Sequence, residues 1–486
     1  MGEESKIDKG LSSLVGNSGS GNVYFIGIGG IGMSAIARFF QSRGVKVSGY
    51  DKTPSALTKE LEASGISIHY EDNIDLAPKD AALIVYTPAI PVDHKELVYY
   101  QLHGYKVVKR SDVLEMITES SFNICIAGTH GKTTITTMIA HLLRDSGYGC
   151  NAFLGGISVN YGTNFWSSDR NVCVIEADEY DRSFLKLNPD IAVITAMDAD
   201  HLDIYGTEES VEQGFIDFSK KIKQGGLLVS KFGLKRGNDL KAARLVTYSL
   251  QNHSADTYAA DIRMMNGSYE FDAILKGSRL ENVKLNMGGL HNVENAVAAI
   301  AVASSLKIEN EKIKAAVESF RGVKRRFEYI IAPSPSPQGG EGRGEAEVVF
   351  IDDYAHHPEE LRALITGAKS LFSQMKCTVI FQPHLYTRTK DHADGFAEVL
   401  DLADEVVLLP VYPARELPIA GVNSEMILKK MKTPNKRVIA KEELTDWIKN
   451  VYVKKLNKDS GQVLVTAGAG DIDTLVGPIK KIIEKT

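Results

Sequence analysis

Short apolar runs alternate along the chain with longer stretches in which apolar residues recur every three or four positions. The first run, Val23–Ile26, precedes a glycine-rich turn, and the stretch after it predicts a helix over Ser34–Arg43. Apolar runs at Lys46–Gly49 and Ala82–Tyr86 predict further strands. Strands that alternate with helices are typical of a parallel sheet covered by helices, so we expect residues 22–119 to form an α/β domain.

The same alternation occurs twice more. The second stretch predicts strands at Asn123–Ala127, Val172–Ile175, Ile191–Ile194 and Gly226–Ser230, then a β-rich region over Tyr248–Leu285 and a buried helix over Asn292–Ser304. The third predicts strands at Val348–Ile351, Thr378–Gln382, Glu405–Leu409 and Gln462–Thr466. We therefore predict three consecutive α/β domains, 22–119, 120–324 and 325–486, preceded by a polar, flexible tail at 1–21.

Composition narrows the classes of partner. The formal net charge is −6 and no long basic run occurs, which argues against nucleic acid and anionic membranes. No apolar stretch approaches the ~18 residues of a membrane span, and the N-terminus is polar and acidic. The four cysteines are scattered without metal-ligand spacing, which favours reduced thiols. We expect a cytoplasmic protein, with the Pro/Gly-rich run at 333–344 forming a solvated loop.

A compressed phosphate loop follows the strand Asn123–Ala127 and reads Gly128-Thr-His-Gly-Lys-Thr-Thr134. Glycines let consecutive backbone N–H groups face phosphate oxygens, Lys132 supplies a charge for the β- and γ-phosphates, and the Thr133 hydroxyl can bind Mg²⁺. A helix predicted over Thr133–Ser146 would direct its positive end at the same anion. The alternative is a glycine-rich turn without a ligand, which the lysine and threonines make less attractive.

A second glycine turn, Gly27-Ile-Gly-Gly-Ile-Gly32, follows the first strand, and Asp51 lies about 20 residues further on. This spacing is typical of dinucleotide-binding folds, in which the carboxylate binds a ribose hydroxyl. The physical requirement is only that a pyrophosphate approaches the backbone closely. A nicotinamide dinucleotide and a UDP-sugar both meet that requirement, and a packing turn is a further possibility.

Acidic segments follow two strands of the second domain. Val172–Ile175 leads into Glu176-Ala-Asp-Glu-Tyr-Asp181, and Ile191–Ile194 leads into a segment that contains His201. Because the carboxyl ends of parallel strands meet at one sheet edge, Glu176 is a candidate Mg²⁺ ligand and His201 a candidate ligand of a second metal. The other carboxylates of the first segment could face the substrate or solvent.

Three further polar clusters occur where a simple linker would not need them: Gly289–Asn295, Asp352–Pro358 and Phe381–Thr389. The last two follow predicted strands of the third domain, where open α/β sheets bind ligands. The adjacent pair His356-His357 is not expected to hold a metal, because neighbouring loop residues rarely ligate one ion together.

In serial order the motifs GIGGIG, GTHGKTT, EADEYD, DADHLD, HNVEN, RRFE, DDYAHHPEEL, FQPHLYTRT and AGAGD resemble those of the Mur ligases of peptidoglycan synthesis. The resemblance covers residues 22–480 and is strongest to the alanine-adding branch. It implies a Rossmann-like UDP-binding domain, a central P-loop ATPase domain and a Rossmann-like C-terminal domain. It also implies ATP-dependent ligation of L-alanine to the carboxylate of UDP-N-acetylmuramate through an acyl phosphate. We expect the chain to act as a monomer or weak homodimer.

The resemblance assigns roles to residues for ATP and Mg²⁺. The phosphate group of ATP would be held by Gly128, Thr129, His130, Gly131, Lys132, Thr133 and Thr134. The rest of the nucleotide would meet Asn292 and Asn295 at the adenine, and Arg326 and Asp353 at phosphate and ribose. Two Mg²⁺ sites are implied, the first on Thr133 and Glu176 and the second on His201.

It also assigns residues to the other substrates. The UDP-sugar would be bound by Gly27, Gly29, Gly30, Gly32, Asp51, His384 and Arg388, and Tyr354 would border the amino-acid pocket. The catalytic group implied by the resemblance comprises Lys132, Glu176, His201, His357 and Arg388.

One departure and three alternatives bear on these assignments. Alanine-adding members usually carry Arg where this chain has Leu385, so a charge is lost there. Within the family, the alternative is the recycling ligase that adds a tripeptide to the same UDP-sugar, although FQPHLYTR resembles the alanine-adding enzymes better. Outside it, the alternatives are a nicotinamide-dependent oxidoreductase, which leaves Gly128–Thr134 without a role, and a catalytically silent UDP-sugar sensor.

Overall fold

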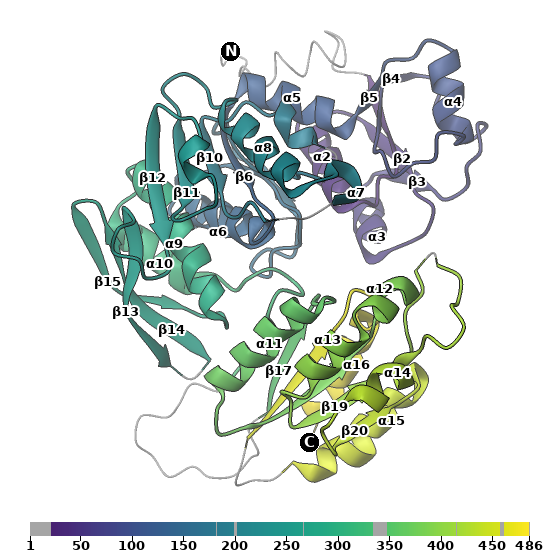
Figure 1. Cartoon of the computed structure of the whole chain (residues 1–486). Helices are drawn as coiled ribbons and strands as arrows, with labels where there is room; N and C mark the ends of the chain where they lie inside the picture. Colours follow the sequence, from purple (N-terminus) through teal and green to yellow (C-terminus); the bar gives the residue numbers. More distant parts are fainter. Residues whose placement is uncertain are drawn as a thin grey trace. The chain divides into compact units, whose positions relative to one another are not determined.

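A computed structural model describes residues 21–180, 182–198, 202–265, 267–333, 348–414, 416–456 and 461–485. The chain divides into two compact units. The first unit takes in Met1–Ala260, Ala273–Leu280 and Glu294–Val317, and the second takes in Asp261–Asp272, Glu281–Val293 and Glu318–Thr486. Three sheets run through them (Figure 1).

The first sheet has the order β3-β2-β1-β4-β5, with every neighbouring pair parallel. Its strands are β1 (Asn22–Ile26), β2 (Val47–Tyr50), β3 (Ser67–His69), β4 (Ala81–Tyr86) and β5 (Val107–Lys109). The accompanying helices are α2 (Ile31–Ser42), α3 (Ala56–Ala63), α4 (Lys95–Leu102) and α5 (Arg110–Ser120). Strand order reverses beside β1, so the glycine turn lies at the switch point where open sheets bind ligands.

The second sheet has ten strands in the order β15-β14-β13-β12-β11-β10-β6-β9-β7-β8. Its parallel centre is formed by β6 (Phe122–Ala127), β9 (Val172–Glu176), β10 (Ile191–Ile194), β11 (Leu227–Lys231) and β12 (Arg244–Ser249). The remaining strands are β7 (Asn151–Phe153), β8 (Phe165–Trp166), β13 (Thr257–Met265), β14 (Ser268–Leu275) and β15 (Ser278–Leu285). Because β6 lies between β9 and β10, the segments after these three strands meet at one edge.

The helices of this region include α6 (Lys132–Asp145), α7 (Leu202–Tyr205), α8 (Glu208–Ser219), α9 (Leu290–Ser305) and α10 (Asn310–Ser319). In α6 the apolar residues Ile135, Met138, Ile139 and Leu142 recur at helical spacing and are fully buried. This burial fixes the helix that begins at the phosphate loop.

The third sheet has the order β16-β17-β21-β18-β19-β20, parallel except for the β16–β17 pair. Its strands are β16 (Glu328–Ile331), β17 (Val348–Asp353), β18 (Lys376–Phe381), β19 (Glu405–Leu408), β20 (Lys436–Val438) and β21 (Gln462–Ala467). The α-helices are α11 (Pro358–Leu371), α12 (Tyr386–Asp391), α13 (Ala393–Leu400), α14 (Ser424–Lys430), α15 (Leu444–Trp447) and α16 (Asp473–Ile483).

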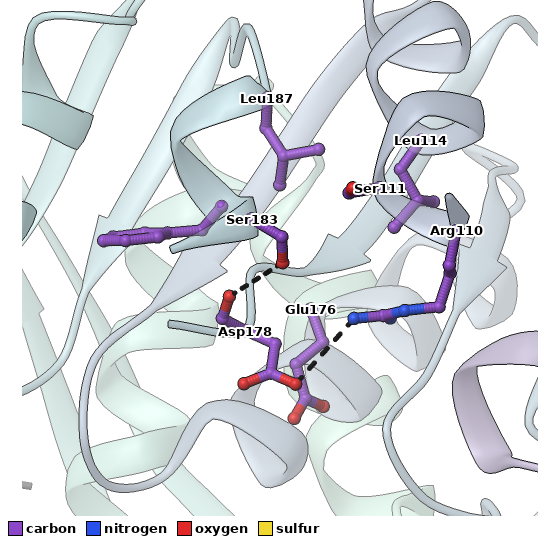
Figure 2. Close-up of a pocket in the computed structure, with 8 residues that line it drawn as sticks. Arg110, Ser111, Leu114, Glu176, Asp178, Ser183 and Leu187 are labelled. Atoms are coloured by element: carbon purple, nitrogen blue, oxygen red, sulfur yellow. Dashed lines mark hydrogen bonds and ion pairs between the residues drawn. The ribbon is translucent and has the colours of Figure 1, made fainter. Parts of the chain in front are cut away.

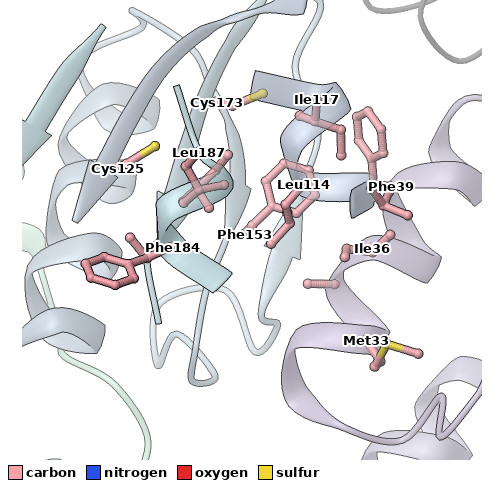
Figure 3. Close-up of a cluster of buried hydrophobic side chains, with 14 of the residues drawn as sticks. Met33, Ile36, Phe39, Leu114, Ile117, Cys125, Phe153, Cys173, Phe184 and Leu187 are labelled. Carbon is pink, nitrogen blue, oxygen red and sulfur yellow. The ribbon is translucent and has the colours of Figure 1, made fainter. Parts of the chain in front are cut away.

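The first two sheets share a hydrophobic core (Figure 3). Phe39 of α2 lies 5.3 Å from the ring of Phe153 in β7 and 6.1 Å from that of Phe165 in β8, measured between ring centres. Leu114 of α5 and Leu187 belong to the same buried cluster. The shared core explains why the first sheet and the parallel centre of the second sheet belong to one compact unit.

The predicted sequence of three α/β regions is confirmed, and the β-rich region at 248–285 is present as β13, β14, β15 and the end of β12. The helix after the first glycine turn begins at Ile31, three residues earlier than expected, because Gly30 already serves as its N-cap. All four cysteines are free thiols, as expected, and all four are buried. The domain boundaries at 119/120 and 324/325 stay predictions.

Other predictions fall outside the described residues. The tail is described only from Gly21, and the Pro/Gly-rich run only at Pro333. His201 and Asp181 also lie outside the described residues. Within the described part of the chain, no helix combines the length and apolar character needed to cross a membrane.

Candidate functional site

The phosphate loop has a backbone that only glycine fits at two positions. Gly128 has φ +134°, and a Cβ there would lie 2.0 Å from the hydroxyl oxygen of Thr195 at the end of β10. Gly131 has φ +78° and is the N-cap of α6. The Thr195 hydroxyl donates to the carbonyl oxygen of His130 at 2.5 Å, which ties the loop to the neighbouring strand. Contacts within the chain therefore hold the loop in a defined shape.

Lys132 is the first residue of α6 and its ammonium group is held by two acceptors. Nζ donates to the carbonyl oxygen of Gly128 at 2.7 Å and to Oε1 of Glu179 at 2.7 Å. The Glu179 side chain is only 1% exposed, so it does not face solvent as the sequence left open. Burial raises the pKa of the Glu179 carboxyl, and the charge of Lys132 opposes that rise. The pair places the ammonium group over the loop.

Thr133 and Glu176 lie together, as the proposed metal site requires. The Thr133 hydroxyl donates to Oε1 of Glu176 at 3.0 Å, and Glu176 is the last residue of β9. Oε2 of Glu176 accepts from the backbone N–H of Gly155 at 3.1 Å. A Cβ at Gly155 would lie 2.2 Å from that oxygen, so a glycine is required beside the carboxylate.

The remaining loop residues occupy different environments. The Thr129 hydroxyl accepts from the backbone N–H of Asp198 at 3.3 Å. His130 is exposed, with Nε2 3.6 Å from the carboxylate of Asp198. Thr134 is buried within the first turn of α6. Thr129 and His130 thus connect the loop to the acidic segment after β10.

The first glycine turn is hydrogen-bonded to the carboxylate of Asp51, the residue that the sequence spacing associates with this turn. Oδ2 of Asp51, which follows β2, accepts from the backbone N–H of Gly29 at 2.7 Å. A Cβ at Gly29 would lie 2.8 Å from that oxygen, and Gly27 has φ +87°. Gly30 and Gly32 lie at the start of α2, where the positive end of the helix dipole favours an anion.

The two asparagines of the HNVEN motif differ in their surroundings. Oδ1 of Asn295 would lie 3.0 Å from a Cβ built on Gly131, so Asn295 is adjacent to the phosphate loop. Asn292 is 3% exposed and its amide donates to the carbonyl oxygen of Gly288 at 2.7 Å. Asn295 therefore lies beside the phosphate loop within the first unit, whereas Asn292 belongs to the second unit.

In the second unit, Asp353 at the end of β17 is held by backbone donors. Its carboxylate accepts from the N–H groups of Phe327 at 2.6 Å and of Ala355 at 2.7 Å. Loss of solvent around it raises the pKa of the Asp353 carboxyl to about 6. Arg326 is exposed, with its guanidinium 5.8 Å from the ring centre of the exposed Tyr354. The RRFE turn and the end of β17 therefore form one local cluster.

His384 and Arg388 lie together after β18. Nη1 of Arg388 is 3.3 Å from Nδ1 of His384, whose ring stacks on Tyr412 with ring centres 5.8 Å apart. Burial and the nearby Arg388 lower the pKa of the His384 imidazole. Leu385 between them has φ +70°, and its N–H donates to the carbonyl oxygen of Tyr412 at 2.9 Å. Leu385 therefore has a strained backbone conformation, and its hydrogen bond to Tyr412 holds it beside His384 and Arg388.

His357 has a structural role that the sequence did not indicate. It is the N-cap of α11, and its Nδ1 accepts from the backbone N–H of Glu359 at 3.5 Å. The carboxylate of Glu360 accepts in turn from the His357 N–H at 3.1 Å. Burial, and then His392, lower the pKa of the His357 imidazole.

Sequence reasoning missed Glu179 as the partner of Lys132 and Gly155 as the partner of Glu176. Glu179 is one of four acidic residues in its segment. The sequence alone does not indicate that its side chain is buried. Gly155 follows β7 and carries no local motif. Its role depends on a neighbouring strand that is distant in sequence.

Three family models cover the chain. The Mur ligase family catalytic domain matches residues 22–121, the Mur ligase middle domain matches 126–303, and the Mur ligase glutamate ligase domain matches 341–470. The chain belongs to the Mur ligase family.

Within this family the chain is similar to enzymes named UDP-N-acetylmuramate–L-alanine ligase. It is 46% identical over 472 residues to the one from Porphyromonas gingivalis strain ATCC 33277, covering 95% of this chain and 99% of that protein. It is 43% identical over 468 residues to the one from Flavobacterium johnsoniae, covering 96% and 98%.

Solved structures give a consistent result. The UDP-N-acetylmuramate–alanine ligase from Thermotoga maritima superimposes with a TM-score of 0.77 at 30% identity, over 96% of this chain and 98% of that one. A murein peptide ligase from Psychrobacter arcticus has a TM-score of 0.63 at 22% identity, over 96% and 99%, and shares the fold.

Proposed function

We propose that this chain is an ATP-dependent ligase that joins L-alanine to the carboxylate of UDP-N-acetylmuramate, with ADP and phosphate as the other products. The single observation that carries this proposal is the cluster of Lys132, Thr133 and Glu176 at the carboxyl ends of β6 and β9. It combines a phosphate-binding cation with the oxygen groups that phosphoryl transfer requires. The alanine-ligase names of relatives at 43–46% identity support the choice of acceptor.

ATP is the nucleotide used by the Mur ligase family, and we assign its phosphates to Gly128–Thr134. The backbone N–H groups of the loop and the start of α6 favour an anion. Lys132 would exchange its contact with Glu179 for the β- and γ-phosphates, which neutralises the charge that develops during transfer. Asn295, adjacent to Gly131, is placed to contact the nucleotide, and Asn292 supports the segment that presents it.

The donor set at Thr133 and Glu176 fits Mg²⁺. The two side-chain oxygens are 3.0 Å apart, and Mg²⁺ in phosphoryl-transfer sites takes one or two protein oxygens together with phosphates and water. No group of three or more His, Cys, Asp or Glu side chains suited to a metal occurs among the described residues. When bound, Mg²⁺ supplies charge neutralisation at the phosphates. We assign a second Mg²⁺ to His201, which lies outside the described residues.

We assign the UDP-sugar to the turn at Gly27, Gly29, Gly30 and Gly32. Its position at the switch point of the first sheet and at the N-terminus of α2 suits a diphosphate. Asp51 already accepts from Gly29, which orders the turn for ligand binding. Membership of the Mur ligase family favours this ligand over a nicotinamide dinucleotide.

In the second unit we assign Arg326 and Asp353 to the nucleotide, and His357, His384 and Arg388 to the substrate carboxylate and γ-phosphate. Arg388 suits a carboxylate because a guanidinium can donate two parallel hydrogen bonds. The exposed Tyr354 would border the amino-acid pocket.

The proposed reaction has two steps. A carboxylate oxygen of UDP-N-acetylmuramate attacks the γ-phosphorus of ATP, the bond to the β–γ bridging oxygen breaks, and ADP leaves. The neutral amine of L-alanine then attacks the acyl carbon, and phosphate leaves with the carboxylate oxygen. The amine loses one proton as the amide forms. Positioning and charge stabilisation by the protein suffice, since no group of the chain needs to become covalently modified.

The proposed function is tested by measuring which amine acceptor the chain uses. The purified chain is incubated with ATP, Mg²⁺ and UDP-N-acetylmuramate, and with either L-alanine or the tripeptide L-alanyl-γ-D-glutamyl-meso-diaminopimelate. We expect UDP-N-acetylmuramoyl-L-alanine by mass spectrometry and no tripeptide product. Product only with the tripeptide would replace this function by that of the recycling ligase.

A further inference from the structure

Arg110 lies close to both predicted ligand sites of the first unit. Figure 2 shows its side chain beside those of Asp178 and Glu176. It is the first residue of α5. Its Nη1 would lie 2.7 Å from a Cβ built on Gly32, so the guanidinium rests against the glycine turn. Its Nη2 lies 3.8 Å from Oδ2 of Asp178, two residues beyond Glu176. The side chain is therefore adjacent to both the turn at the start of α2 and the edge that carries Glu176.

The donors of this guanidinium are largely unused. A guanidinium has five N–H donors, and the distance to Asp178 exceeds that of a hydrogen bond. Within the described part of the chain, the Arg110 side chain makes an ion pair with Asp178 and no hydrogen bond to another residue. The side chain is only 20% exposed, and it faces a small hollow that is also lined by Glu176 and Ser183. A mostly buried cation with unused donors favours an anionic ligand.

We propose that Arg110 binds the diphosphate of the UDP-sugar. This assignment rests on the proposed function and adds a residue to it. The diphosphate is favoured over the muramoyl carboxylate because the guanidinium touches Gly32, at the helix start to which we assign the diphosphate. Asp178 balances the charge of Arg110 in the absence of substrate, and the diphosphate replaces it as the main partner.

The test is calorimetric binding of two nucleotides to the full chain, without ATP or L-alanine. UDP-N-acetylglucosamine carries the diphosphate but lacks the lactyl carboxylate, whereas UDP-N-acetylmuramate carries both. We expect Arg110→Ala to weaken both ligands by roughly 10- to 100-fold, which is the effect of losing a hydrogen-bonded charge. Arg110→Lys keeps the charge without the planar fork and should fall between the wild type and Arg110→Ala.

Two controls separate binding from structure. Asp178→Asn removes the ion pair but leaves Arg110, so it should bind both UDP-sugars at least as tightly as the wild type. ADP affinity of every variant should equal that of the wild type, which shows that the phosphate loop is intact. Equal weakening by Asp178→Asn and Arg110→Ala would make the pair structural and overturn the proposal.

The remaining outcomes are distinguishable. Unchanged affinity of Arg110→Ala for both UDP-sugars overturns the proposal and leaves the proposed function standing. Weakening of UDP-N-acetylmuramate alone assigns Arg110 to the carboxylate and overturns the diphosphate assignment. Failure of the wild type to bind either UDP-sugar contradicts the proposed function itself.

Discussion

At the scale of single residues, the account depends on a buried charge that is held ready for a ligand. Lys132 is 15% exposed and its partner Glu179 is 1% exposed, so the ammonium group is largely removed from water. A charge in such surroundings interacts strongly with a phosphate, because little solvent screens it. Glu179 accepts from this ammonium group and holds it beside the loop.

We therefore expect Lys132→Met to lower kcat for phosphate release by about 100- to 1,000-fold, the size of effect seen when a preorganised charge is removed. Lys220→Met is a matched control, because Lys220 is exposed at the end of α8 and pairs only with Asp217 among the described residues. Steady-state phosphate release measures both variants. Turnover by Lys132→Met within a few-fold of the wild type would remove the lysine from the mechanism.

His384 provides a test that depends on pH. Burial and Arg388 lower the pKa of the His384 imidazole, so its neutral form, which can accept from the guanidinium through Nδ1, persists to a lower pH than in an unperturbed histidine. Protonation gives that nitrogen a hydrogen and breaks the contact. We expect an NMR titration of the ring protons, assigned by comparison with His384→Gln, to show a midpoint below 6.5. A midpoint at or above 6.5 would contradict the described pair.

At the scale of elements, strand ends determine where the chemistry lies. The loops after β6 and β9 carry the residues that we assign to the phosphates and the metal, and the turn after β1 carries those that we assign to the UDP-sugar. At helix α11, one residue has both a structural role and an assigned role in substrate binding. His357 caps this helix and is also assigned to the substrate.

Two substitutions separate these roles. His357→Ala removes the cap and should cost about 1 kcal/mol of stability, whereas His357→Asn restores a good N-cap and should cost only a few tenths. Thermal unfolding measures both. Because the imidazole itself is assigned to the ligand, we expect both variants to lose at least roughly tenfold in kcat/KM. Wild-type activity in His357→Asn would leave His357 as a helix cap alone.

Much of this arrangement could be predicted, and the exceptions share a cause. Periodicity and glycine spacing located the strands, the loop at Gly128–Thr134 and the Thr133–Glu176 pair, because these depend on local sequence and on parallel strand order. The contacts of Glu179, Gly155 and Arg110 could not be predicted. Each depends on packing between segments that are distant in sequence.

At the scale of the whole molecule, membership of the Mur ligase family indicates that the separate candidate sites take part in one reaction. The Mur ligase models span three regions of the chain, and full-length relatives at 43–46% identity are named as alanine-adding enzymes. The central claim is that ATP phosphorylates the carboxylate of UDP-N-acetylmuramate before L-alanine attacks it. An acyl phosphate requires one carboxylate oxygen to leave with the phosphate.

Oxygen transfer tests this claim most directly. UDP-N-acetylmuramate labelled with ¹⁸O in its carboxylate is incubated with the chain, unlabelled ATP, Mg²⁺ and L-alanine, and the released phosphate is analysed by mass spectrometry. The account predicts a single ¹⁸O in each phosphate formed, with release that depends on both UDP-N-acetylmuramate and L-alanine. Phosphate that carries no ¹⁸O would contradict it.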